Sequence, residues 1–145
     1  MYFVDREKIE AMLQYLERQI HLFQGQKEWS TPVEKAALER LCHMMIECVL
    51  DVGNAMIDGF IMRDPGSYED IIDILMDEKV INAETGECIK TLIQYRKGLV
   101  QDYIGVDHSG LQDQFTANQD KLFVFAANVR NYLMNELGPV SAFKN

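Results

Sequence analysis

Apolar side chains recur every three or four residues along most of the chain, which is the period of an α-helix. Only three prolines and nine glycines interrupt the 145 residues, and no segment alternates apolar and polar residues as a half-buried strand would. A chain with this pattern buries its apolar stripes by packing helix against helix. The sequence therefore predicts an all-α fold.

Turn and capping residues divide the chain into helices. Thr31 and Pro32 are a favourable N-cap and first helical residue, and Glu34 stands at the position that completes a capping box. Ser67 and Asp70 resemble a second capping box. We expect an antiparallel bundle of four long helices and one short helix. The expected spans are about 6–24, 32–58, the short helix from Ser67 to Glu78, a helix from Asn82 to the break at Gly105, and a last helix from Gly110 to Leu137.

The length and composition of the chain narrow its class. We expect one helical domain over residues 1–145, with a short C-terminal tail from about residue 138. Three cysteines without a C-x-x-C pair favour a reducing, cytoplasmic setting. The N-terminus has no signal-peptide h-region, and no apolar segment is long enough to cross a bilayer, so no membrane association is expected.

The segment from Tyr95 to Tyr103, with the sequence YRKGLVQDY, carries the most informative motif. It resembles the signature of HepT-like HEPN proteins, in which an arginine is followed by four residues, a histidine, one further residue and a tyrosine. Arg96 and Tyr103 match this signature, whereas Gln101 occupies the histidine position. The resemblance extends to the helical layout, to Glu47 and Asp51 within the second helix, and to the turn from Pro65 to Tyr68.

This resemblance implies a homodimer in which the motif helices of both subunits meet and form a metal-independent ribonuclease site that needs no cofactor. It also implies a nucleotidyltransferase antitoxin as partner, which adenylylates the motif tyrosine. By position, Arg96 would bind the scissile phosphate and Tyr103 would be the modification target. Because the formal net charge is −9, contact with RNA would depend on a local basic patch around Lys90, Arg96 and Lys97.

The glutamine in the motif changes the chemistry that can be expected. Cleavage of RNA without a metal needs groups that accept and donate protons, and histidine suits this work because its pKa lies near neutrality. The amide of Gln101 can hold a phosphate oxygen but does not titrate. General acid and base groups contribute on the order of 10² to 10⁴ in rate, so we expect cleavage to be impaired or lost.

The three motif positions do not share one face of an ideal helix. At about 100° per residue, Arg96 and Tyr103 lie within about 20° of each other, whereas Gln101 lies about 140° from Arg96. We therefore expect either a distortion near Gly98 or a site completed by the second subunit. His108, in the loop after the motif helix, is a candidate substitute for the missing histidine.

A polar stripe follows the second helix at spacings of three and four residues, and it consists of His43, Glu47, Asp51, Asn54 and Asp58. The spacing of His43 and Glu47 suits two metal ligands, but no second ligand pair accompanies them, and we expect no metal site. We expect instead that Glu47 and Asp51 face the motif and orient Arg96 through charge-assisted hydrogen bonds.

Two hypotheses remain open at this stage. The first is a dimeric binding or regulatory protein that has kept the fold but lost cleavage, and Gln101 favours it. The second is an active RNA endonuclease toxin, with Arg96 at the phosphate and Gln101 or a recruited histidine in a modified mechanism.

Overall fold

The computed structural model describes residues 2–139, and every regular element in that part of the chain is helical. The all-α prediction is confirmed. No helix within these residues is long and apolar enough to span a membrane. Residues 140–145 of the expected tail lie outside the described part. The elements are α1 (Arg6–Gly25), α2 (Pro32–Gly59), α3 (Tyr68–Asp77), α4 (Ala83–Ile93), α5 (Arg96–Val100), a 3-10 turn (Tyr103–Gly105) and α6 (His108–Leu137).

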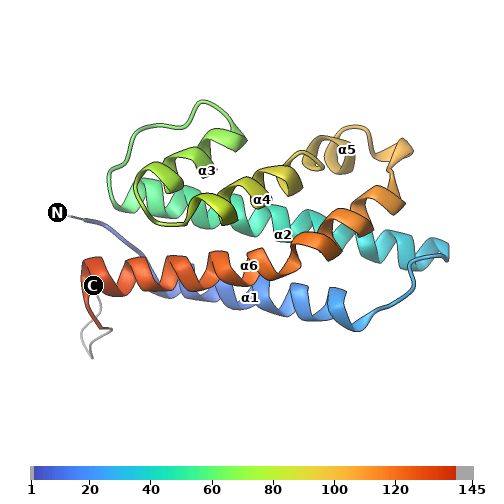
Figure 1. The fold of residues 1–145 in the computed structure, drawn as a ribbon, viewed down its shortest axis with the longest axis horizontal. Coiled ribbons are helices and arrows are strands. Elements are labelled where there is room, and N and C mark those ends of the chain that lie inside the picture. The colour runs from blue at the N-terminus through green and yellow to red at the C-terminus, as the bar shows by residue number, and fades with distance from the viewer. Residues whose placement is uncertain (1, 140–145) are drawn as a thin grey trace.

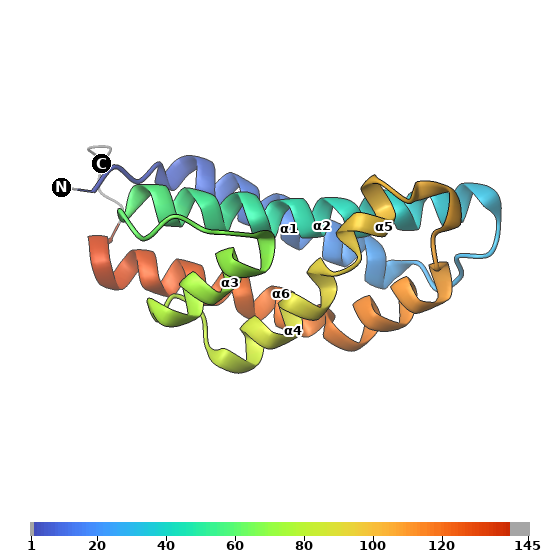
Figure 2. The ribbon, with the colours of Figure 1, turned by 90° about the horizontal axis from the view of Figure 1, so that it is seen from above.

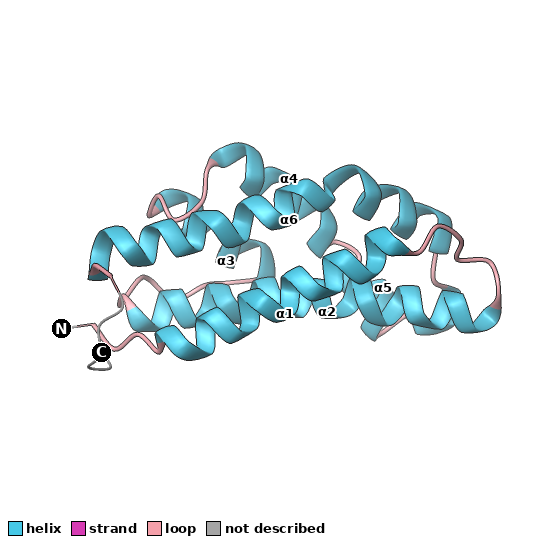
Figure 3. Ribbon diagram, turned by 90° about the horizontal axis from the view of Figure 1, so that it is seen from below, coloured by secondary structure: helices cyan, strands magenta, loops and turns pink. Residues whose placement is uncertain are grey.

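Three long helices form the body of an antiparallel bundle (Figure 1). α1 packs against both α2 and α6, and it runs opposite to both of them. α3 packs on α2, and α4 packs on α3 and α6, so this pair covers the remaining side of the bundle (Figure 2). α5 then crosses to α2 near the end where α6 begins. The same arrangement, seen from the opposite side in Figure 3, contains only helices and loops.

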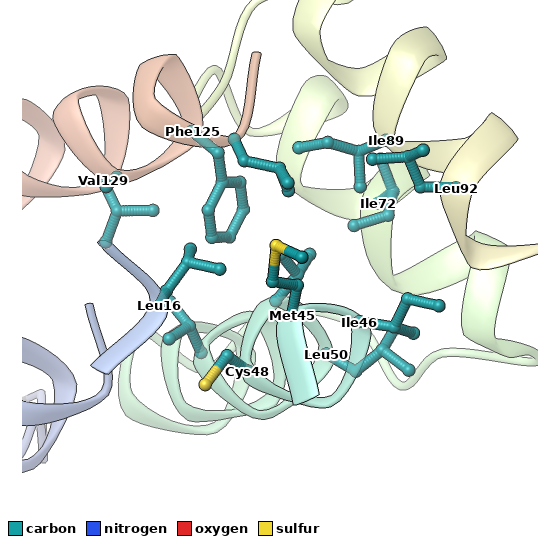
Figure 4. Close-up of a cluster of buried hydrophobic side chains, with 14 of the residues drawn as sticks. Leu16, Met45, Ile46, Cys48, Leu50, Ile72, Ile89, Leu92, Phe125 and Val129 are labelled. Atoms are coloured by element: carbon teal, nitrogen blue, oxygen red, sulfur yellow. The ribbon is translucent and has the colours of Figure 1, made fainter. Parts of the chain in front are cut away.

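One apolar core joins all of these helices. Side chains from five helices meet in its centre (Figure 4), and each of them is at most 1% exposed: Leu16 of α1, Met45 of α2, Ile72 of α3, Ile89 of α4 and Phe125 of α6. The buried face of α1 follows the helical spacing of its apolar residues and consists of Ile9, Leu13, Leu16, Ile20 and Phe23. Burial of this extent fixes the rotation of each helix, and with it the direction in which the polar stripe of α2 points.

The predicted helix starts are present, with one difference in detail. Thr31 and Glu34 form the reciprocal capping box that the sequence predicts. Ser67 caps α3 by accepting from the backbone N–H of Asp70 at 3.1 Å. The carboxylate of Asp70, however, accepts from the backbone N–H of Gly66 and from Arg63. The capping box at Ser67 is therefore only half formed: the Asp70 carboxylate binds the charged, stronger donor Arg63 and not the backbone N–H of Ser67.

The helix that carries the motif differs from the continuous helix expected between Asn82 and Gly105. α4 ends at Ile93, the chain turns at Gln94 and Tyr95, and α5 contains only five residues. The backbone N–H groups of Gln101 and Asp102 both donate to the carbonyl of Lys97, at 2.8 and 3.1 Å, which closes α5. The motif segment is thus distorted, but not at the expected place: Gly98 lies inside α5, and the breaks are at Gln94 and Tyr95 before Arg96 and at Gln101 after Val100.

Candidate functional site around Arg96

Arg96 is the first residue of α5, and it points back onto α2. Its Nε donates a hydrogen bond to Oε1 of Glu47 at 2.6 Å. Both side chains are partly shielded from water, at 21% and 24% exposure. An ion pair that is also a hydrogen bond is stronger than either interaction alone, and shielding reduces its screening by salt. The expected contact of Arg96 with Glu47 is therefore present.

A second contact joins the same guanidinium to an aromatic ring. The central carbon of the Arg96 guanidinium lies 4.3 Å from the centre of the Tyr68 ring, a cation–π geometry. Tyr68 is the first residue of α3, so the arginine is held from two different helices. Within residues 2–139, neither terminal nitrogen of Arg96 has a hydrogen-bond partner. These two nitrogens remain available to an acceptor such as a phosphate oxygen.

Glu47 also contacts a histidine. Nε2 of His43 lies 3.4 Å from Oε1 of Glu47, the same oxygen that accepts from Arg96. The imidazole is partly exposed. One carboxylate oxygen therefore links an imidazole and a guanidinium, which lie within about 6 Å of each other by these two contacts. The helical spacing of α2 places His43 on the polar stripe, but no local pattern connects it with Arg96.

The other acidic residues of the stripe are less closely tied to the motif. Asp51 is exposed and makes no hydrogen bond to Arg96 in the described part of the chain. Partial burial and the neighbouring charge of Glu47 raise the pKa of Asp51, while Lys8 and Arg96 act in the opposite direction. Asp51 also lines an open hollow of about 340 Å³ together with Lys8, Met12, Asn54, Ala55 and Asp58. Asp51 therefore acts on Arg96 only through its charge.

Gln101 and Tyr103 lie beyond the end of α5, on an open corner of the molecule. Both side chains are exposed, as is Lys97, and Tyr103 reaches 64% exposure. Ile104 beside them is 95% exposed. No hydrogen bond joins the side chain of Gln101 or Tyr103 to Arg96 in the described residues. The fold of the chain therefore brings Arg96 to Glu47 but leaves the side chains of Lys97, Gln101 and Tyr103 on the surface.

His108 is not a loop residue, because α6 begins at this position. Its Nε2 lies 2.8 Å from Oε2 of Glu39 on α2. Glu39 precedes Glu47 by two helical turns, or about 12 Å along the helix axis. His108 therefore contacts α2 about two turns away from the place where Arg96 does. The histidine that contacts Glu47, the partner of Arg96, is His43. Among residues 2–139, no group of three or more His, Cys, Asp or Glu side chains could hold a metal ion.

The turn that presents Tyr68 is fixed by one carboxylate. Asp70 accepts two hydrogen bonds from Arg63, at 2.7 and 2.9 Å, and a third from the backbone of Gly66 at 2.8 Å. The Arg63 hydrogen bonds, followed by the Gly66 bond, lower the pKa of Asp70 to about 2. This network connects the loop after α2 to the first turn of α3, where Tyr68 lies.

The chain is similar in sequence and in overall fold to known proteins. A family model described as Ribonuclease HepT-like matches residues 7–129. A curated protein of Bacillus subtilis (strain 168), named "Putative RNase YutE", is 54% identical over 144 residues, which cover 99% of this chain and 100% of that protein. A solved structure of YutE from Bacillus subtilis, described as a cytosolic protein of unknown function, is similar with a TM-score of 0.95 at 54% identity, covering 99% of this chain and 100% of the other.

Replacement of Asp70 by Asn should remove part of the acid dependence of stability. The pKa of Asp70 is about 2 in the folded chain, against 3.8 for an unperturbed carboxyl. Between these values the unfolded chain binds more protons than the folded chain, so stability falls as the pH falls. Wild type should be more stable than Asp70→Asn near neutral pH. This difference should close between about pH 4 and about pH 2, as measured by urea unfolding followed by circular dichroism.

Asp77→Asn is the matched control for this experiment. Its carboxylate lies 3.7 Å from the same Arg63 guanidinium but is largely exposed, so the variant should follow wild type. A difference between wild type and Asp70→Asn that stays constant over the whole acid range would contradict the role given to Asp70.

Proposed function

Because the chain belongs to the HepT-like ribonuclease family, we propose that it is a dimeric HEPN protein that binds RNA through Arg96 and cleaves it weakly or not at all. The observation that carries this proposal is the state of Arg96: its Nε is bound to Glu47, its guanidinium lies over the Tyr68 ring, and its terminal nitrogens have no hydrogen-bond partner among residues 2–139. An arginine held in this way meets a phosphate with little further loss of conformational freedom. Lys97 on the same short helix adds positive potential.

Gln101 limits the chemistry of the proposed site. A phosphate bound by Arg96 is activated for attack only if another group takes the proton from the 2′-hydroxyl and a further group protonates the leaving oxygen. A glutamine amide does neither at neutral pH. The protein therefore retains the binding part of a ribonuclease site and has lost the proton-transfer part that the motif histidine supplies in the family.

The exposed corner around Gln101 supports a two-fold dimer. Val100, Tyr103 and Ile104 are all exposed, and an isoleucine at 95% exposure beside an exposed tyrosine is typical of a surface that is covered in an assembly. If the corners of two subunits meet, two copies of Arg96, Lys97 and Gln101 are brought to one surface. Sedimentation velocity should then report about twice the monomer mass of 16.7 kDa, and a monomer at all concentrations would contradict this part of the proposal.

Gln101→His should create cleavage where wild type has little. If the site is otherwise intact, a titrating imidazole at this position restores proton transfer and raises the rate by about 10² or more. Gel analysis of a labelled single-stranded RNA measures the cleavage, and fluorescence anisotropy of the same RNA measures binding. Arg96→Ala should weaken binding about tenfold or more, because a charged hydrogen-bond donor is lost. Equal RNA affinity of wild type and Arg96→Ala would contradict the proposed function.

His43 favours a second candidate function, an active RNA endonuclease of a toxin–antitoxin pair. Its imidazole shares Glu47 with Arg96 and is partly exposed, so it is the recruited base that this alternative needs. Under the alternative, wild type cleaves RNA, His43→Asn abolishes cleavage, and His108→Ala leaves it unchanged. Under the main proposal, wild type shows little or no cleavage, and any residual cleavage does not depend on His43.

Tyr103 is the proposed modification target of a nucleotidyltransferase partner. Its exposed phenol can attack the α-phosphorus of ATP, which forms a phosphodiester and releases pyrophosphate. Incubation with a cognate nucleotidyltransferase and ATP should therefore add one adenylyl group, measured by intact mass. Tyr103→Phe should abolish the addition, whereas Tyr2→Phe, a control at another exposed tyrosine, should not. No addition to wild type by a cognate enzyme would contradict this role.

A further inference from the structure

From the position of Tyr68 we infer that its ring is a stacking platform for one unpaired nucleobase, beside the phosphate bound by Arg96. This inference rests on the proposed function, and it adds the substrate class: single-stranded RNA. Tyr68 is 48% exposed although one face of its ring lies against the guanidinium. The contact with Arg96 uses only one face of the ring, so the exposed remainder of the Tyr68 side chain is available to a ligand.

The platform is rigid for a surface residue. Tyr68 lies at the first position of α3, directly after the Ser67 N-cap. The loop before it is tied to α3 by the Arg63 and Gly66 hydrogen bonds to Asp70, at 2.7 to 2.9 Å. Since the ring and the loop that precedes it are held in place without a ligand, stacking of a base on the ring would carry little additional entropic cost.

The chemistry of the pair matches one nucleotide. The guanidinium edge offers two donors to a phosphate, and the tyrosine offers an apolar ring to a base. Ribose joins phosphate and base in one nucleotide, so adjacent sites for the two groups suit the same ligand. Bases in an A-form duplex are stacked on each other and not accessible to such a ring, whereas unpaired bases are.

Because the protein is acidic, its affinity for RNA needs a contribution that does not depend on charge, such as base stacking. At a formal net charge of −9, the chain repels a polyanion at long range, and a few phosphate contacts have to act against that repulsion. Base stacking depends little on charge or salt and tolerates every base, because each base has a π-face. The platform therefore supplies affinity that the phosphate contact lacks, without requiring a defined sequence.

The test compares two fluorescent probes by anisotropy: a short single-stranded oligouridine, and a ribose-phosphate chain of the same length without bases. Wild type should bind the oligouridine about tenfold or more tightly than the abasic chain. Tyr68→Leu should lower the ratio of the two affinities to about one, because it removes the stacking surface, while the lost contact with Arg96 weakens the binding of both probes by the same factor. Tyr68→Phe should keep the preference, because it keeps the ring.

Tyr2→Leu is the matched control, since Tyr2 is another exposed tyrosine, at 50%, whose ring packs against Phe60 near the N-terminus, at the end of the molecule opposite α5 (Figure 1); it should behave as wild type. If Tyr68 only braces Arg96, Tyr68→Leu weakens both probes equally, so that the ratio of the two affinities keeps its wild-type value, and the inference is overturned. Arg96-dependent binding with no preference for bases also overturns it while the proposed function survives. Binding of both probes that Arg96→Ala leaves unchanged overturns the proposed function itself.

Discussion

The hydrogen-bonded ion pair between Arg96 and Glu47 is the interaction on which the candidate site depends. Glu47 has a fixed position because its neighbours on α2, Ile46 and Cys48, are buried in the core. Arg96 reaches it only because the chain turns at Gln94 and Tyr95 and lays α5 on α2. The break in the motif helix is therefore a requirement of the site, since a continuous helix would carry Arg96 along α4 instead.

The parts of the fold that were predictable are those set by local rules. The capping box at Thr31 and the buried face of α1 follow from spacing alone, and both are present. The turn at Gln94 and Tyr95 was not predictable, because neither residue is a helix breaker. Its cause is tertiary: Tyr95 and Leu99 pack on the core, and the Tyr95 hydroxyl donates to the carbonyl of Gly110 at 3.3 Å.

The same distinction applies to the site. Spacing on α2 predicts that Glu47 and Asp51 share one face of the helix, because a helix turns by a fixed angle per residue, but it does not specify the neighbour of that face: Glu47 binds Arg96, whereas Asp51 makes no hydrogen bond to it within residues 2–139. The contact of Tyr68 with Arg96 joins residues on α3 and α5, and no local pattern encodes it. The residues of the candidate site are therefore held to different degrees. Arg96 is held from two helices, whereas Gln101 and Tyr103 lie exposed on the corner where we propose that a second subunit binds.

The central claim is that Arg96 presents free terminal nitrogens to RNA while Glu47 retains its Nε. Nitrogen-15 NMR of the arginine side chains tests this directly, with the Arg96 signals assigned from Arg96→Lys. The account predicts that added single-stranded RNA shifts the terminal-nitrogen signals of Arg96 in a saturable manner and leaves its Nε hydrogen bond intact. RNA that binds while every Arg96 signal stays unchanged would contradict it.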